Sequence, residues 1–177
     1  MPDVTVTPAD PTSAPARTAL RAYYDDIVTR WHARPATAAE VDDLVAGAGD
    51  DRLTPPHGLL LLARRGEEVL GCAGLRVLGD VGEVTRLHVT AAARGRGVGT
   101  GLLTAVEAEA RGRGLAVLRL ETRRDLVEAL RLYARHGFTA TGRFTDDPYA
   151  HHCLAKRLAP ADPDRGGPQT RRSSHNP

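Results

Sequence analysis

Cysteine, methionine, tryptophan and lysine are scarce in this chain. Its 177 residues include two cysteines, one methionine, one tryptophan and one lysine, Lys156. Cys72 and Cys153 lie in apolar runs far apart, and neither has the cysteine or histidine spacing of a zinc site. His151 and His152 make a poor chelating pair, because neighbouring residues of a strand point to opposite faces. We therefore expect reduced cysteines and no bound metal.

The chain also lacks long apolar stretches and a large excess of charge of one sign. The segment Met1–Pro11 lacks the basic start and apolar core of a secretory signal, and no run approaches the roughly 18 apolar residues that a membrane span needs. The net charge is only +2, and arginines alternate with acidic residues, which disfavours a nucleic-acid-binding protein. The sequence predicts a cytoplasmic protein with no membrane or nucleic-acid partner.

The composition that remains fits a single domain. Apolar residues make up 41% and charged residues 26% of the chain, as in ordinary globular proteins. From Ala159 onward the chain is rich in Pro, Gly, Ser, Asp and Arg, and has too little apolar surface to offset the entropy of ordering. We expect one domain over residues 1–158 and a disordered tail over 159–177.

The spacing of apolar residues predicts a mixed α/β order. Apolar positions three to four residues apart predict helices, and short continuous apolar runs predict buried strands. Thr37 and Glu40 are spaced as a capping box, and residues 8–15 are expected to form a linker. The helices are predicted over 17–31, 37–46, 98–113 and 125–136, and the strands over 4–7, 59–65, 69–78, 81–89, 115–121, from 138, and over 150–158.

The most specific local signal is a glycine-rich segment between the strand that ends at Val89 and the helix that begins near Val98. Its glycines let the backbone turn tightly and leave amides unobstructed at a helix start, where the helix dipole favours an anion such as phosphate. Two commoner phosphate loops are excluded. The chain has no GxxxxGK motif followed by Ser or Thr, and Thr100 and Leu102 stand where GxGxxG requires a third glycine.

Two motifs resemble the GNAT superfamily of acyl-CoA-dependent N-acetyltransferases. Arg94-x-x-Gly97-x-Gly99 resembles its pyrophosphate loop, and residues 128–138, EALRLYARHGF, resemble its ALxLYxxxGF helix and following strand. The similarity covers about residues 59–158. It implies the GNAT fold, a mixed, mostly antiparallel sheet of about six or seven strands flanked by about four helices. It also implies transfer of an acetyl group from acetyl-CoA to a primary amine, here of a small molecule.

The resemblance further implies which residues bind the co-substrate. The backbone of three strand residues would pair with the pantetheine arm, the loop amides would bind the pyrophosphate, and two arginines would add positive charge. These residues are Leu87, His88, Val89, Arg94, Gly95, Arg96, Gly97, Val98, Gly99 and Thr100. The amide of Leu87 or His88 would stabilise the developing oxyanion.

Catalytic roles follow in the same way. An amine with a pKa near 10 must lose a proton before it attacks a thioester, so a base should raise the rate. Glu83 is the first candidate, because it stands where related histone acetyltransferases have their catalytic glutamate. A pairing of Glu83 with Arg86 is the alternative, and the competing bases are His88, Glu121 and His151. Tyr133 is implied as the general acid that protonates the departing thiolate.

The acceptor side is less specific. Many relatives carry an asparagine seven residues before the tyrosine, where this chain has Leu126, and Arg123 or Arg124 are the possible substitutes. Acidic and aromatic residues of the first helix and of the last strands form either an anionic aromatic pocket for a cation or a solvated surface. They are Tyr23, Tyr24, Asp25, Asp26, Trp31, Asp146, Asp147 and Tyr149. Two alternative functions stay open, a non-catalytic acyl-CoA sensor and a protein N-acetyltransferase. A homodimer is also possible.

Overall fold

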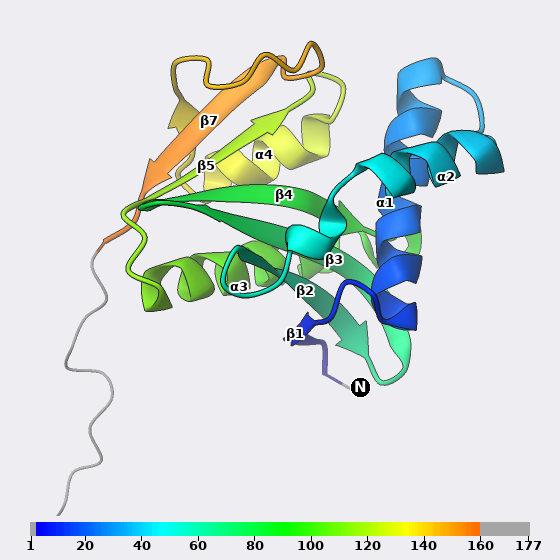
Figure 1. The fold of residues 1–177 in the computed structure, drawn as a ribbon, viewed down its shortest axis with the longest axis horizontal. Helices are drawn as coiled ribbons and strands as arrows, with labels where there is room; N and C mark the ends of the chain where they lie inside the picture. The colour runs from blue at the N-terminus through cyan, green and yellow to red at the C-terminus, as the bar shows by residue number, and fades with distance from the viewer. Residues whose placement is uncertain (1–2, 160–177) are drawn as a thin grey trace, which may run out of the picture.

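Seven strands form one open sheet, with helices packed on both faces (Figure 1). The computed structural model describes residues 3–159. The strands are β1 (Thr5–Ala9), β2 (Gly58–Arg65), β3 (Glu68–Leu78), β4 (Val81–Val89), β5 (Val117–Thr122), β6 (Thr139–Ala140) and β7 (His152–Arg157), in the spatial order β1-β2-β3-β4-β5-β7-β6. The helices are α1 (Ala14–His32), α2 (Ala38–Gly47), α3 (Val98–Gly112) and α4 (Val127–Arg135), with short 3-10 helices η1 (Asp50–Arg52) and η2 (Ala91–Ala93).

Neighbouring strands are antiparallel except for β4 and β5, which are parallel. The predicted fold class is thereby confirmed. Most helices and strands begin and end within three residues of the predicted positions. Helix α2 has the predicted capping box, in which the Thr37 amide donates a hydrogen bond to Glu40 Oε2 over 2.8 Å. The predicted disordered tail lies, from residue 160, outside the described residues.

The prediction of a linker over residues 8–15 is wrong at both ends. β1 continues through Pro8 to Ala9, because it is an edge strand and proline is tolerated there. Helix α1 begins at Ala14, and its Pro15 lies in the first turn, where a missing amide removes no intrahelical hydrogen bond.

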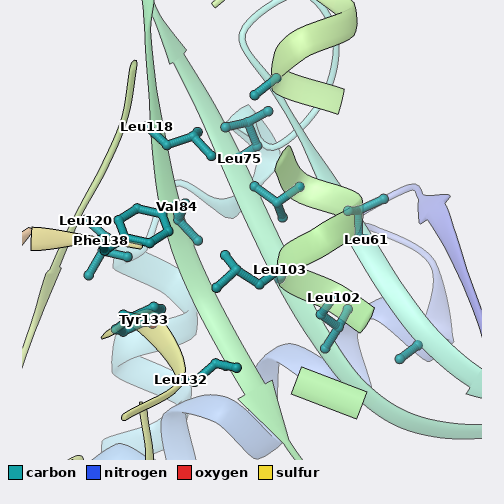
Figure 2. Packing of buried hydrophobic residues seen from close by; sticks show 14 of the residues in the cluster. Leu61, Leu75, Val84, Leu102, Leu103, Leu118, Leu120, Leu132, Tyr133 and Phe138 are labelled. Atoms are coloured by element: carbon teal, nitrogen blue, oxygen red, sulfur yellow. The ribbon is translucent and has the colours of Figure 1, made fainter. Parts of the chain in front are cut away.

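Two apolar layers hold the helices to the sheet. Leu59 and Leu61 of β2 face α3 and α4, whereas Leu60 and Leu62 face α1, which explains the uninterrupted apolar run of that strand. Figure 2 shows the first layer, in which side chains of the sheet lie against Leu102 and Leu103 of α3.

A buried carboxylate joins three elements on the α3 side of the sheet. Glu107 of α3 accepts a hydrogen bond from Lys156 Nζ of β7 over 2.7 Å and from Arg111 over 3.1 Å, and its Oε1 lies 3.2 Å from His136 Nδ1 at the end of α4. Burial alone would raise the pKa of Glu107, but the hydrogen bonds from Lys156 and His136 outweigh it and hold the pKa below its ordinary value.

The central strands separate after a short contact. β4 and β5 pair only at their first three residues, where Val81–Glu83 of β4 lie beside Val117–Arg119 of β5. Figure 1 shows the two strands diverging beyond these residues. β5 stays paired with β7 as far as Thr122, so the opening lies between β4 and β5. A sheet that splits in this way leaves the backbone of β4 free to bind another extended chain.

A bulge interrupts β4 inside the opening. Thr85 pairs with Gly74 and His88 with Cys72, so that Arg86 and Leu87 together stand opposite the single residue between those two on β3. The extra residue reverses which side chains face which layer. Val84 and, after the bulge, Leu87 and Val89 pack on the α3 side, whereas the ring of His88 lies toward α1.

Candidate functional site

A cleft of about 420 Å³ lies between the end of β4 and helix α4. Its walls are the end of β4, the glycine-rich loop, the first turn of α3, three residues of α1 and one stripe of α4. Of the residues expected to bind the co-substrate, all except Arg96 line this cleft. Arg96 is exposed outside it.

The loop has the backbone that an anion site requires. Gly95 and Gly97 have φ values of +74° and +79°, a left-handed conformation that glycine adopts without strain. Gly97 caps α3, whose first intrahelical hydrogen bond runs from the Gly101 amide to the Gly97 carbonyl over 2.9 Å. The amides of residues 98–100 therefore have no partner inside the helix, and they lie at the positive end of its dipole.

Arg94 lines the cleft and also contacts two other elements of the protein. Its Nε donates to the Val89 carbonyl over 3.0 Å, and its Nη2 lies 3.1 Å from Asp26 Oδ2 of α1. Asp26 also pairs with Arg30 at 3.2 Å. Through these contacts Arg94 ties the loop to β4 and α1.

Two other arginines supply charge to the cleft. Arg131 and Arg135 line it from α4, on the stripe that also presents Glu128 and Leu132. The sequence reasoning missed them. The available signal was their spacing, since positions 128, 131, 132 and 135 share one helical face.

Glu83 is held by two arginines of neighbouring strands. Its Oε1 lies 3.1 Å from Arg76 Nη1, and its Oε2 lies 3.0 Å from Arg119 Nη2. The alternative pairing with Arg86 is not formed, and Glu83 does not line the cleft. Only 16% of its side chain is exposed, so its carboxylate sits at the closed end of the opening between two positive charges.

Glu121 lies two residues beyond Arg119 on β5 and is half-buried. Burial first, and then the nearby charge of Asp147, raises the pKa of Glu121 above its usual range. Within residues 3–159 no arginine, lysine or histidine forms an ion pair with it. A raised pKa makes this carboxylate a stronger proton acceptor than an ordinary glutamate.

Tyr133 lies in the core beside the cleft rather than on its wall. Its ring packs edge-on against Phe138, with centroids 5.8 Å apart. Figure 2 shows the two rings beside each other, and the neighbouring Leu132 lines the cleft. Burial raises the pKa of Tyr133, so the phenol keeps its proton. The hydroxyl of Tyr133 forms no hydrogen bond with another described residue. It is also not one of the fully buried polar atoms that lack a hydrogen-bond partner.

The two histidines named as competing bases differ in setting. Burial lowers the pKa of His88. The Nε2 of this ring lies 4.0 Å from Asp26 Oδ2, and its Nδ1 is buried with no hydrogen-bond partner among residues 3–159. A proton on that nitrogen would have no acceptor, which argues against protonation of this ring. His151 Nδ1 instead accepts the Arg124 amide over 3.3 Å.

Leu126 lines the cleft in the position where relatives have asparagine. Arg123 does not replace it, because its guanidinium binds Asp125 and donates to the Ile27 carbonyl over 2.8 Å. The cleft therefore has an apolar contact at this point.

The residues expected on the acceptor side come together only in part. Trp31 packs edge-on against Tyr149 with centroids 4.7 Å apart, which joins the end of α1 to the segment before β7. Tyr23 lines the cleft, but Tyr24 donates to Asp50 over 2.8 Å. The predicted residues thus divide between an aromatic pair, the cleft wall and internal contacts.

Two further observations concern metal ions and membranes. Within residues 3–159, no three histidine, cysteine or acidic side chains gather closely enough to hold a metal ion. None of the described helices has the length and apolar character needed to cross a membrane.

The chain is similar to known proteins in sequence and in fold. Residues 17–138 match the model of the acetyltransferase (GNAT) family. Over 119 residues the chain is 33% identical to an uncharacterised N-acetyltransferase of Schizosaccharomyces pombe, covering 66% of this chain and 69% of that protein. Over 94 residues it is 34% identical to an IAA acetyltransferase of Azospirillum brasilense, covering 52% of this chain and 61% of that one. Its fold is similar to that of the PaiA N-acetyltransferase of Thermoplasma acidophilum, solved in complex with coenzyme A, with a TM-score of 0.69, 15% identity, and coverage of 88% and 99% of the two chains.

Proposed function

Since the chain belongs to the GNAT family of acyl-CoA-dependent N-acetyltransferases, we propose that it acetylates a primary amine of a small molecule, which attacks acetyl-CoA directly in a ternary complex. The observation that carries this proposal is the cleft between β4 and α4, with unpaired helix amides at one end and the backbone of β4 along one wall. The acyl thioester of acetyl-CoA supplies the group to be transferred.

The residues of the cleft fit this co-substrate. The amides at the start of α3 bind the pyrophosphate, and Arg131 and Arg135 add charge that complements phosphate groups. The backbone of Leu87–Val89 pairs with the pantetheine amides as an added strand would. The Leu87 amide, at the bulge, is the donor that stabilises negative charge on the acyl oxygen.

Two side chains divide the proton transfers. Tyr133 keeps its proton and gives it to the departing thiolate. Glu121, the half-buried carboxylate on β5 that has no ion pair within residues 3–159, takes a proton from the amine directly or through water. Glu83, the first candidate from the sequence, is neutralised by Arg76 and Arg119, and comparison of the two glutamates tests that original prediction.

The acceptor class rests on the charges of the α1 face. Glu121 and Asp147 lie near enough for the charge of Asp147 to help raise the pKa of Glu121, whereas the charge of Glu83 is balanced by its two arginines. Such a pair of carboxylates attracts an ammonium ion. The similarity to an IAA acetyltransferase, whose name denotes a small-molecule substrate, supports the same choice over a peptide.

The deciding experiment measures thiol release from acetyl-CoA across small amines, amino acids, polyamines, aminoglycosides and peptides. We expect turnover with one small-molecule class.

With that substrate, Glu121→Gln should lower kcat by about 100-fold, whereas Glu83→Gln should lower it less. In the wild type, kcat/KM should fall as pH drops through the raised pKa of Glu121. Acetyl-CoA binding without turnover on any amine would instead indicate a sensor, and turnover only on peptides a protein acetyltransferase.

Arg131→Ala is expected to weaken acetyl-CoA binding about fivefold, equivalent to about 1 kcal/mol, because it removes a partly solvated charge that faces the phosphates. Isothermal titration at low and high salt measures this, and the difference from wild type should shrink as salt screens the charge. Arg113→Ala, at the far end of α3, is the matched control. Equal affinities for Arg131→Ala and wild type would show that this side chain does not face a phosphate.

A further inference from the structure

The β4 bulge has an unusual residue at its centre. Arg86 has φ of +53°, and with Ala33 it is one of two non-glycine residues with positive φ among the described residues. A side chain in this left-handed conformation costs free energy, and glycine would occupy the position without that cost. Such a residue persists where its surroundings hold it in place.

The guanidinium of Arg86 has three polar partners. Its Nε donates to Asp50 Oδ1 over 2.8 Å, its Nη1 to Thr85 Oγ1 over 2.8 Å, and its Nη2 to the Ala48 carbonyl over 3.2 Å. Ala48 and Asp50 belong to the segment after α2, far from β4 in sequence. Only 21% of the Arg86 side chain and 11% of the Asp50 side chain are exposed, so these contacts are shielded from water.

The network continues on both sides of the bulge. Asp50 Oδ2 accepts a hydrogen bond from the Tyr24 hydroxyl over 2.8 Å, and the guanidinium lies 5.3 Å from the Tyr24 ring and 5.7 Å from the Tyr23 ring. The carbonyl of Arg86 accepts from the thiol of Cys72 over 3.2 Å. The bulge is thus fixed through its side chain by α1 and η1 and through its backbone by β3.

The bulge determines what the cleft receives. Leu87, the next residue, lines the cleft, and because of the bulge at Arg86 it faces the α3 side of the sheet, whereas the His88 ring lies toward α1. We infer that Arg86, held by Asp50, is a positioning residue for acetyl transfer. It keeps the Leu87–Val89 backbone in the geometry that binds the co-substrate and stabilises the acyl oxygen. This inference rests on the proposed function for its catalytic consequence.

The test compares Arg86→Gly and Asp50→Asn with wild type. Glycine accepts the backbone conformation but removes the network, and asparagine keeps the shape of Asp50 while it removes the charge. Arg65→Ala, which loses an ion pair with Glu68 in the β2–β3 hairpin, is the matched control. Hydrogen exchange of the ligand-free proteins is measured residue by residue, together with kcat and the KM for acetyl-CoA.

We expect exchange at the Leu87–Val89 amides to be about tenfold faster in Arg86→Gly and Asp50→Asn, with exchange in α3 and α4 unchanged. The kcat should fall by about 10- to 100-fold, and the KM for acetyl-CoA should change less than about threefold, since a displaced acyl-oxygen donor weakens the transition state more than binding. Arg65→Ala should match wild type in every measurement.

Two results would overturn the inference. One is exchange and kcat in Arg86→Gly equal to those of wild type. The other is faster exchange throughout the sheet and helices, with kcat and KM changed together, which would make Arg86 a general stabilising residue. If the wild type acetylates no amine, the proposed function fails, and the exchange measurement still decides whether Arg86 holds the bulge.

Discussion

Replacing Tyr133 by phenylalanine is expected to lower kcat by about 100-fold, the usual order for loss of a general acid, with little change in the KM for acetyl-CoA. The substitution removes one hydroxyl and leaves the ring against Phe138. Without a proton donor the thiolate must leave as an anion, which raises the barrier of the chemical step and not the energy of the bound state. Thiol release with both substrates saturating measures this effect.

The structure separates this effect from damage to the fold. Because no hydrogen bond joins the Tyr133 hydroxyl to another described residue, its loss should leave the thermal midpoint of unfolding within about 2 °C of wild type. Thr139→Val, which removes an exposed hydroxyl of β6, provides the control for activity. A Tyr133→Phe variant that keeps more than about a third of the wild-type kcat would exclude Tyr133 as the acid.

Glu107→Ala is expected to destabilise the folded chain by about 3 kcal/mol, because it leaves the half-buried cations Arg111 and Lys156, and the His136 ring, without their shared partner. For a domain of this size, that loss corresponds to a thermal midpoint lower by about 10 °C. Glu109→Ala, on the exposed side of the same helix, should cost less than about 0.5 kcal/mol. Calorimetry of the three proteins measures the difference, and equal midpoints for the two variants would contradict the expectation.

The same cluster sets a direction for pH. The lowered pKa of Glu107 means that its stabilising effect is complete above the ordinary glutamate pKa of about 4.3 and is lost as pH falls through the lower, folded-state pKa. The difference in midpoint between wild type and Glu107→Gln should therefore be largest at neutral pH and narrow in acid.

The sequence predicted those parts of the site that are local in the chain. The glycines of the loop and the Tyr133 helix are each read from fewer than a dozen neighbouring residues, and both lie beside the cleft. The four helices and the central strands follow for the same reason, because apolar periodicity is a local property.

Pairing between strands could not be predicted in this way. The partners of Glu83 are Arg76 and Arg119, which meet it only through the register of β3 and β5. The bulge is also absent from the pattern, since residues 81–89 read as an uninterrupted strand, and the reversal of sides at Arg86 depends on contacts with a segment nearly forty residues earlier.

The contact between Lys156 and Glu107 has a chemical consequence for an enzyme that acylates amines. Lys156 is the only lysine of the chain, and its ammonium group donates to a buried carboxylate. All other permanent side-chain cations are arginines, whose guanidinium groups stay protonated and are not nucleophiles at any physiological pH. The side chains of this acetyltransferase therefore offer acetyl-CoA scarcely any competing nucleophilic nitrogen of the amine type, and incubation with the acyl donor should leave its surface charge unaltered.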